Sequence, residues 1–384
     1  MLHTPLHQYH LDHGAQMVEF AGWEMPIRYK WPAQFGTGGG IIDEHNQVRK
    51  SGGFFDVSHM GRVRFHGRHA RRLLERVCTR RISDMQAGQC RYSLVCNERG
   101  GVRDDVLVYR VDDDDFLVVV NASNREKLLP HFKEAQGDLI CTIDDRTAQT
   151  AMVAIQGPNV MQMIGRFSRE IPTLKRYRFV EKNYLIMKLT VSRTGYTGED
   201  GVEVILPAPM VGMALKMLFK DLGEGDAAIV KPAGLGCRDT LRMEAAMPLY
   251  GHELGEDFSA LGAGIDFAIN LDKADDARGE AFIGMEALQK TAAAGGPPLR
   301  LAGLALEGPR AARQGMEVLA GGKRVGTVTS GCVSPTLGKS IAMAYVDAGS
   351  HAEGTAVEVD TGKGTRLAGV VVPMPFYKRP PAAT

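Results

Sequence analysis

The feature that most limits the fold is a change of composition at residues 292–298, where three alanines, two glycines and two prolines follow one another. A run so poor in bulky side chains cannot build a hydrophobic core and is typical of a linker. Beyond it, short apolar runs are separated by glycine-containing turns, at residues 301–306, 317–319, 324–330, 341–346, 356–359 and 367–372. Strands of this length and spacing predict a small β-barrel or sandwich. We therefore expect a separate C-terminal β domain over residues 299–384.

The segment before the linker, residues 1–290, mixes helical and strand patterns and predicts an α+β region. With 384 residues, the chain has room for about two to three domains. Lys and Arg (46) nearly balance Asp and Glu (45), so neither nucleic acid nor an anionic membrane is expected as a partner. No apolar stretch is long enough to span a bilayer.

The cysteines and glycines argue against the common cofactors. The six cysteines lack the paired spacing that suits zinc or an iron–sulfur cluster, and we interpret them as reduced thiols of a cytoplasmic protein. The first residues fit neither a secretory signal nor a transit peptide. The glycine-rich tract at residues 31–40 predicts a mobile loop, and Ile41 stands where a dinucleotide motif needs its third glycine. We expect no metal, flavin or nicotinamide.

Four histidines near the amino terminus recur every three to four residues: His3, His7, His10 and His13. That spacing predicts one face of a helix. A metal site at this face would still lack a carboxylate or thiolate ligand, so we expect the face to be solvated.

Two adjacent acids, Asp104 and Asp105, carry the strongest chemical signal of the chain. They lie between a glycine pair and an apolar strand expected at residues 106–111. Because side chains alternate along a strand, the two carboxylates should point to opposite faces, one of them toward the interior. A buried carboxylate needs hydrogen-bond donors, which either the fold or a ligand with N–H groups supplies.

Three further segments combine glycines, aromatic rings and charge. Residues 192–203 hold three glycines, with Tyr196 able to stack and Glu203 able to accept paired N–H donors, although a structural hairpin loop explains the glycines equally well. Arg238 lies near the start of a helix expected within residues 234–244. Its charge opposes the helix dipole there, so we expect it to bind a carboxylate of a ligand or of a neighbouring acid. Met60 fits either plain core or the wall of a pocket for an aromatic ligand.

These segments, in this order, resemble the aminomethyltransferases of the glycine cleavage system, the T-proteins. The similarity extends from Thr4 to Tyr377 and is carried by long motifs at residues 20–26 (FAGWEMP), 55–60 (FDVSHM), 100–108, 192–203, 234–244 and 329–338 (TSGCVSPTLG). It implies an α+β fold of three domains in a cloverleaf around a central folate cavity. Those domains would be residues 54–150, residues 1–53 with 151–290, and the C-terminal barrel.

The resemblance also implies a reaction and its partners. T-proteins transfer the one-carbon unit of an aminomethyl group, carried on the lipoyl arm of the H-protein, to tetrahydrofolate. The products are 5,10-methylenetetrahydrofolate, ammonia and the dihydrolipoyl H-protein. In such a reaction the protein would act mainly by positioning two substrates and by keeping water from a reactive methylene carbon.

Roles of single residues follow by their positions in the family motifs. Asp105 matches the catalytic acid that faces folate N5 and N10, Asp104 its outward neighbour, and Glu203 the acid that receives the pterin N–H groups. The remaining folate-pocket positions fall on Met60, Tyr92, Tyr109, Asn121, Tyr196, Arg238, Phe267 and Tyr377. Arg238 would lie near the folate tail or the lipoyl entrance. Phe267 stands where some relatives carry Trp, and His252 where relatives commonly carry Gln or Asn.

Two alternatives share the resemblance in fold. One is a folate-dependent demethylase of the same superfamily, which acts on a methylated sulfonium or amine. The other is a non-catalytic folate-binding protein of iron–sulfur cluster assembly. Proteins of the second kind carry a cysteine just before a Tyr-x-Gly motif, whereas Leu249 precedes Tyr250 here, so this alternative is disfavoured.

Overall fold

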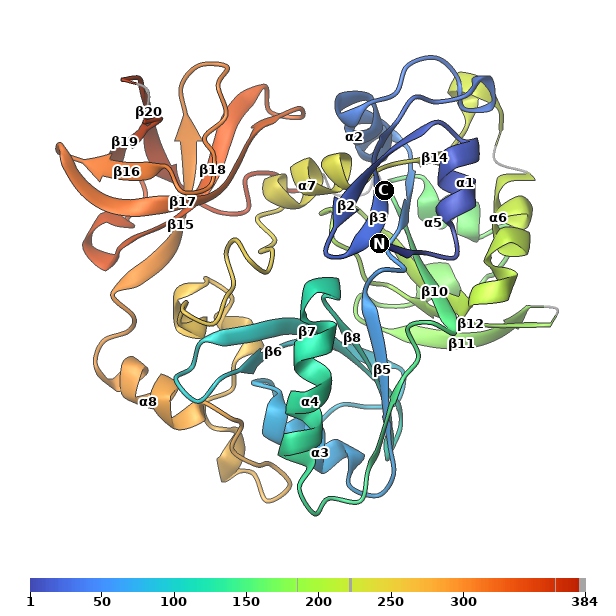
Figure 1. Ribbon diagram of the computed structural model, residues 1–384, viewed down its shortest axis with the longest axis horizontal. Coiled ribbons are helices and arrows are strands. Elements are labelled where there is room, and N and C mark those ends of the chain that lie inside the picture. The colour runs from blue at the N-terminus through green and yellow to red at the C-terminus, as the bar shows by residue number, and fades with distance from the viewer. Residues whose placement is uncertain (185, 221–222, 363, 380–384) are drawn as a thin grey trace. The chain divides into compact units, whose positions relative to one another are not determined.

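The computed structural model describes residues 1–184, 186–220, 223–362 and 364–379, and its architecture mixes helices and several sheets (Figure 1). The helices are α1 (His7–Asp12), α2 (Ile41–Lys50), α3 (Ala70–Val77), α4 (Arg125–Gln136), α5 (Val160–Ile164), α6 (Val211–Lys220), α7 (Leu235–Glu244) and α8 (Met285–Ala293). The strands before the linker are β1 (Leu2–His3), β2 (Ala15–Phe20), β3 (Trp23–Tyr29), β4 (Gly53–Asp56), β5 (Gly61–His66), β6 (Gln89–Cys96), β7 (Val102–Asp112), β8 (Asp115–Val120), β9 (Thr142–Asp145), β10 (Thr150–Gln156), β11 (Phe179–Tyr184), β12 (Met187–Ser192), β13 (Gly201–Pro207) and β14 (Lys231–Pro232). Those after it are β15 (Leu299–Leu306), β16 (Glu317–Ala320), β17 (Lys323–Ser334), β18 (Lys339–Asp347), β19 (Ala356–Asp360) and β20 (Arg366–Val372).

The chain divides into two compact units, each built from several segments. Unit 1 comprises Met1–Ala70, Met85–Arg91 and Leu107–Asp239, and unit 2 comprises Arg71–Asp84, Tyr92–Val106 and Thr240–Thr384. The division passes through α3, β6, β7 and α7, so these elements contribute residues to both units. Among the described residues, no helix is both long and apolar enough to cross a membrane.

The C-terminal strands form a closed barrel in the order β15-β18-β17-β16-β19-β20, which confirms the predicted β-barrel. These strands appear in orange and red in Figure 1. Strand β18 is buried on both faces: Ala342, Ala344 and Val346 fill the barrel interior, whereas Ile341 and Met343 pack outside it. Residues 380–384 of the predicted domain lie outside the described residues.

The main sheet of unit 1 has the order β11-β12-β13-β10-β4-β14. Strands β10 and β13 pair antiparallel over their full length, and β4 pairs with β10 on the other side. Residues of this sheet and of helices α5 and α6 share one apolar core, which includes Phe54, Val153, Val202 and Leu215. The segment of residues 192–203 connects β12 to β13, so its two ends are held by this sheet.

The N-terminal histidines do not form a solvated helix face, and that prediction was wrong. His3 lies on β1, before the helix begins, and His10 on α1 is fully buried. The Nε2 atom of His10 lies 2.9 Å from Asp56 Oδ2, and its Nδ1 atom lies 2.8 Å from the Tyr29 hydroxyl. Periodicity alone missed this because a polar side chain can face the interior when buried partners satisfy both ring nitrogens.

The glycine-rich tract of residues 31–40 is anchored by two aromatic side chains. Trp31 and Phe35 are buried and pack with Tyr29, and the Trp31 indole N–H donates to the carbonyl of Pro232 at 3.0 Å. The ammonium of Lys231 lies 4.7 Å from the centre of the Trp31 ring. These contacts anchor the tract within unit 1, and the mobility that its glycines predict stays a prediction.

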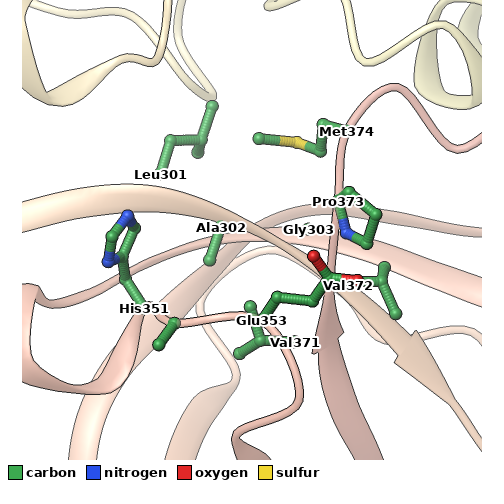
Figure 2. A pocket seen from close by; sticks show the side chains of 10 residues that line it. Leu301, Ala302, Gly303, His351, Glu353, Val371, Val372, Pro373 and Met374 are labelled. Atoms are coloured by element: carbon green, nitrogen blue, oxygen red, sulfur yellow. The ribbon is translucent and has the colours of Figure 1, made fainter.

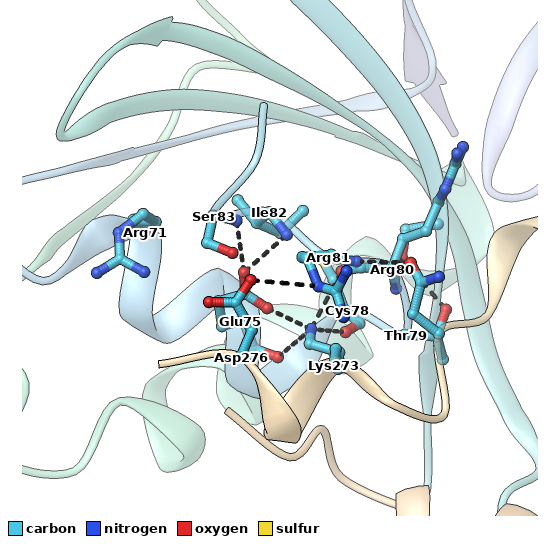
Figure 3. A network of polar contacts seen from close by, with 12 residues as sticks. Arg71, Glu75, Cys78, Thr79, Arg80, Arg81, Ile82, Ser83, Lys273 and Asp276 are labelled. Atoms are coloured by element: carbon cyan, nitrogen blue, oxygen red, sulfur yellow. Dashed lines mark hydrogen bonds and ion pairs between the residues drawn. The ribbon is translucent and has the colours of Figure 1, made fainter. Parts of the chain in front are cut away.

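Unit 2 contains a fully buried ion pair between Lys273 and Glu75 (Figure 3). The ammonium lies 2.6 Å from Glu75 Oε2 and donates to the carbonyls of Glu75, Cys78 and Arg80. Glu75 Oε1 in turn accepts two backbone N–H groups of the loop after α3. The network fixes the carboxyl end of α3 to the turn that carries Lys273.

Candidate functional site

Strand β7 places the two adjacent acids on opposite faces, as alternation predicts, but the buried one is Asp104. Asp104 has no exposed surface, while Asp105 is half-buried. The prediction that Asp104 faces outward was therefore wrong. Asp104 lies on the same face of the strand as Val102 and Val106, and this face is the interior one. Asp105 is the acid that a ligand can reach.

Asp105 contacts Tyr92 within unit 2, and Tyr92 in turn lies beside Phe267. The Tyr92 hydroxyl donates to Asp105 Oδ2 at 3.1 Å. The rings of Tyr92 and Phe267 lie 6.0 Å apart and are inclined by 33°. Phe267 keeps 59% of its surface exposed, which is unusual for a side chain of its size. Unit 2 thus offers an accessible carboxylate beside an accessible aromatic ring.

Tyr377 is held near the carboxyl end of α7, also in unit 2. Its backbone N–H donates to the carbonyl of Glu244 at 2.8 Å, and its side chain is half-buried. The Glu244 carboxylate accepts hydrogen bonds from Ser334 and Thr336. The C-terminal segment and the loop after β17 are therefore both tied to one buried acid.

In unit 1, Glu203 is held by a chain of hydroxyl groups. The Thr194 hydroxyl donates to Glu203 Oε2 at 2.6 Å, Ser192 Oγ lies 2.6 Å from Thr194 Oγ1, and the Tyr109 hydroxyl lies 3.1 Å from Ser192 Oγ. Because each hydroxyl has one proton, the donation of Thr194 to the carboxylate requires Thr194 to accept from Ser192. The chain is then polarised toward Glu203, which is 7% exposed.

The resemblance implies that Tyr109 lines the folate pocket, but the side chain is not accessible to a ligand. It has no exposed surface, and its ring packs edge-on against Phe179 at 5.3 Å. Burial raises the pKa of Tyr109 well above its ordinary value, so its hydroxyl stays protonated. Its connection with the site is the hydrogen-bond chain that ends at Glu203.

The glycines of residues 192–203 have a structural cause. A Cβ atom on Gly195 would lie 1.9 Å from Gln156 Oε1, and one on Gly201 would lie 2.2 Å from the carbonyl of Ile155. The Gln156 amide occupies this space and donates to the carbonyls of Thr194 and Val202. The close approach brings Thr194 to the hydrogen-bond chain, so the structural and functional explanations of the segment are compatible.

Arg238, on the first turns of α7, lies against aromatic rings. Its guanidinium carbon is 4.8 Å from the centre of the Tyr196 ring and 5.9 Å from that of Phe55. Burial lowers the pKa of the guanidinium, and its NH1 atom is buried with no hydrogen-bond partner. No ion pair in the described part of the chain involves Arg238, so the neighbouring acid that the sequence allowed as its partner is not found.

Met60 and Asn121 are half-buried and lie at the ends of strands of unit 1. Met60 ends the loop after β4, and its carbonyl accepts from the fully buried guanidinium of Arg62. Arg62 also donates to the carbonyls of Ser58 and Thr150, both at 2.7 Å. The Asn121 carbonyl accepts the N–H groups that begin the turn into α4.

A hollow of ≈260 Å³ lies elsewhere, in the barrel of unit 2 (Figure 2). Its wall is mainly apolar, with Leu301, Val371 and Met374, and two ionisable side chains, His351 and Glu353, also line it. None of the described residues that line it is a predicted site residue. The hollow is therefore not the candidate site, which consists of the residues around Asp105 and around Glu203.

Comparison with known proteins decides the family. The GCVT N-terminal domain model matches residues 6–273, and the glycine cleavage T-protein C-terminal barrel domain model matches residues 300–378. The chain belongs to the glycine cleavage T-protein family. It is 45% identical over 378 residues to an aminomethyltransferase of Rubrobacter xylanophilus, covering 98% of this chain and 94% of that protein.

Other T-protein family members agree over the full length. An aminomethyltransferase of Cutibacterium acnes is 40% identical over 385 residues, covering 98% of both chains. The crystal structure of the glycine cleavage system aminomethyltransferase T from Bartonella henselae matches with a TM-score of 0.87 over 98% of both chains, at 28% identity. The T-protein resemblance of the sequence is thus confirmed, and so is the fold class.

Sequence reasoning missed His59, which this T-protein places beside the loop of Met60. His59 is 4% exposed, Phe20 lies edge-on against its ring at 5.6 Å, and its Nδ1 atom has no hydrogen-bond partner among the described residues. Burial lowers the pKa of the imidazole to about 4, so His59 is neutral at pH 7. No spacing in the sequence distinguished it from an ordinary neighbour of Ser58.

Sequence reasoning also missed the supports that hold this T-protein's loops in place. Burial alone would raise the pKa of Asp56, but the hydrogen bond and charge of His10, with hydrogen bonds from Ser58 and Thr4, lower it to about 2. The Nδ1 atom of His252 lies 3.0 Å from the carbonyl of Thr329.

Proposed function

We propose that this chain is the aminomethyltransferase of a glycine cleavage system. It would transfer the methylene carbon of an aminomethyl group on the lipoyl arm of the H-protein to tetrahydrofolate. The carbon–sulfur and carbon–nitrogen bonds of the carrier break, two bonds from the carbon to folate nitrogens form, and ammonia and the dihydrolipoyl carrier leave. The observation that carries the proposal is family membership over the full length of the chain, with relatives named aminomethyltransferase that cover 98% of it.

We assign catalysis in unit 2 to Asp105. Its accessible carboxylate can accept an N–H group of the folate and so orient the nitrogen that attacks the one-carbon unit. The Tyr92 hydroxyl restricts the rotation of this carboxylate through the hydrogen bond to Oδ2. Phe267 supplies an aromatic face beside the acid, and Tyr377 a further contact from the C-terminal segment.

We assign recognition of the pterin in unit 1 to Glu203. A planar pterin carries adjacent N–H donors, and a carboxylate whose Oε2 atom is already fixed by Thr194 presents its other oxygen in a defined direction. Tyr109 would act through the hydroxyl chain. Around this acid, Tyr196 is proposed as a stacking partner and Arg238 as a ligand for the negatively charged tail, while Met60 and Asn121 would line the pocket.

The proposal is tested by comparing two neutral variants of the acid pair. Asp105→Asn should retain measurable tetrahydrofolate binding but lower turnover with aminomethylated H-protein by roughly 10²–10⁴-fold, the usual contribution of a positioned acid–base group. Asp104→Asn is the matched control, since its side chain is buried and any loss should appear in the unfolding free energy. Unchanged turnover in Asp105→Asn, with inactive but folded Asp104→Asn, would contradict the assignment.

The two alternatives predict different substrates. A demethylase would consume a methylated sulfonium or amine with tetrahydrofolate and without H-protein, and an assembly protein would show no tetrahydrofolate-dependent turnover. Neither is favoured, because the relatives that cover the chain are named aminomethyltransferases. A cytoplasmic site of action agrees with the six cysteines, which all lie in the described part of the chain and form no disulfide.

A further inference from the structure

Three potential metal-ligating side chains of the N-terminal segment converge at the surface of unit 1. The Nε2 atoms of His3 and His7 lie 3.1 Å and 2.7 Å from the same oxygen of Glu24, Oε2. The two imidazole rings are stacked, with their centres 3.8 Å apart and an angle of 7° between them. One ligand atom of each residue lies within 4.8 Å of the other two. The carboxylate that the sequence pattern lacked is therefore supplied by another element.

The backbone places these residues together. Strand β1 pairs with β3 in parallel, and in this register His3 stands directly opposite Glu24. The turn after β1 then brings His7, the first residue of α1, to the same carboxylate. Thr4 fixes this turn, because its hydroxyl donates to the buried Asp56 at 2.6 Å and accepts the N–H of Leu6 at 3.2 Å.

We propose that His3, His7 and Glu24 form a binding site for a divalent transition-metal ion such as Zn²⁺. Two imidazole nitrogens and one carboxylate oxygen are a common donor set for this ion, with water completing the coordination. Ligand atoms of a tetrahedral zinc site lie about 3.3 Å apart, given bonds of about 2.0–2.1 Å. The 3.1 Å distance from His3 to Glu24 is close to this value, whereas the 2.7 Å distance from His7 is that of a hydrogen bond and would lengthen when an ion binds.

The three side chains have the freedom that metal binding requires. Their exposed fractions are 52% for His3, 18% for His7 and 32% for Glu24, so water and ions reach the cluster. The parallel rings must tilt to point both Nε2 atoms at one ion, and the exposed His3 ring can do so without disturbing a packed core.

A bound ion would tie β1, α1 and β3 together. The same helix α1 carries His10, which hydrogen-bonds Asp56 at the end of β4. Metal binding at one end of α1 would thus reinforce the segment that supports the loop of residues 57–60. This consequence is independent of the proposed transferase activity, because metal binding is measured without folate or H-protein.

The test uses the full chain, purified without a histidine tag and treated with a chelator. Titration with ZnCl₂ in a calorimeter should give one site per chain, and Co²⁺ should give the visible absorption of a nitrogen- and oxygen-ligated ion. His7→Asn and Glu24→Gln should each raise the Zn²⁺ dissociation constant at least about tenfold, since loss of even an outer-sphere partner typically costs 10–100-fold. His66→Asn, at the half-buried end of β5, is the control and should leave it unchanged.

Hydrogen–deuterium exchange of residues 2–12 should slow in the presence of Zn²⁺ in the parent chain and not in Glu24→Gln. Absence of heat and of cobalt absorption in the folded parent chain would overturn the proposal, and the cluster would then be a hydrogen-bonded surface group. Equal binding by the parent chain and both cluster variants would also overturn it, because the metal would be bound elsewhere.

Discussion

Glu203 allows a sharp test of how a ligand-binding acid is held, because the hydroxyl chain behind it can run in either direction. In Glu203→Gln the side chain is isosteric but carries an NH₂ group. If this group takes the place of Oε2, Thr194 must accept rather than donate. Thr194 then donates to Ser192, and Ser192 donates to the main-chain carbonyl of residue 203, which lies 3.3 Å away. Every buried group keeps a partner, and the amide oxygen still faces the ligand.

The expected cost of Glu203→Gln is therefore moderate. Hydrogen bonds to a charged group contribute about 1.5–3 kcal/mol and neutral ones about 0.5–1.5 kcal/mol. Loss of the charge should weaken tetrahydrofolate binding by about 1–2 kcal/mol, or roughly 5- to 30-fold. Ser192→Ala alone should change the dissociation constant little, since the bond from Thr194 to the carboxylate remains.

The double variant, Glu203→Gln with Ser192→Ala, should bind tetrahydrofolate much more weakly than the product of the two single effects predicts. Without Ser192, a Thr194 that accepts from the amide has no acceptor for its own proton, and an unsatisfied buried donor costs about 1–3 kcal/mol. If the amide of the Gln side chain is rotated instead, its NH₂ group faces the N–H donors of the ligand, and two donors then oppose each other. Either way, the double-mutant cycle should show a coupling of at least about 1 kcal/mol.

The assay is calorimetric titration with tetrahydrofolate under anaerobic conditions, with urea unfolding of each variant as a control for folding. Ser192→Ala is expected to lose stability, because the buried Tyr109 hydroxyl loses its Ser192 partner. This loss of stability occurs in both variants that carry Ser192→Ala, so it cancels when the coupling free energy of binding is calculated. Additive effects on the dissociation constant would refute the argument that the hydroxyl chain orients the side chain of residue 203.

The remaining predictions concern stability. His59 has a pKa of about 4 in the folded protein, below the ordinary 6.5, so the unfolded chain binds the additional proton. The contribution of neutral His59 to the free energy of unfolding is complete above pH 6.5. It is lost as the pH falls toward 4, by at most about 1.4 kcal/mol per pH unit. Unfolding free energies from urea titrations between pH 4 and 6.5 should fall with this slope in the parent chain and with a smaller slope in His59→Gln. Lys273→Met should cost about 3–5 kcal/mol, because Glu75 stays buried without its cation. Adding Glu75→Gln should recover part of that loss in urea unfolding, and no recovery would show that the ion pair is not the cause.

The parts of the fold that the sequence predicts best are those with local causes. The barrel strands are bounded by glycine turns and preceded by a linker without bulky side chains, so each could be located from its own neighbourhood. Alternation likewise placed Asp104 and Asp105 on opposite faces of β7. It could not decide which face is interior, because that depends on the packing partners of the strand rather than on its own pattern.

Long-range partners explain the other differences. His10 was expected in solvent because no local residue satisfies it, whereas Asp56 lies 46 residues away in sequence. Glu24 joins His3 and His7 only through the pairing of β1 with β3. The tract of residues 31–40 is anchored through Trp31 to the carbonyl of Pro232, a contact across 201 positions. A single sequence contains the residues of such contacts but not the pairing.

The charged groups of unit 1 that we assign to ligand binding are held differently from those that stabilise the fold. Arg49 and Glu199, with nitrogen and oxygen 2.8 Å apart, form a buried ion pair, in which each charge neutralises the other. Glu203 is instead fixed by neutral hydroxyls and Arg238 by aromatic faces, and neither forms a direct ion pair with any described residue. The charge of Glu203 acts on Arg238 without such contact and partly offsets the effect of burial on the pKa of the guanidinium. Dipoles orient a charge without cancelling it, so its field remains available to a ligand. A buried charge without a counter-ion in direct contact is costly, and part of this cost is recovered when a ligand with complementary N–H or anionic groups binds. The same reasoning explains why substitutions at Glu203 and Arg238 should affect ligand binding more than folding, whereas substitution of Arg49 should chiefly lower the unfolding free energy.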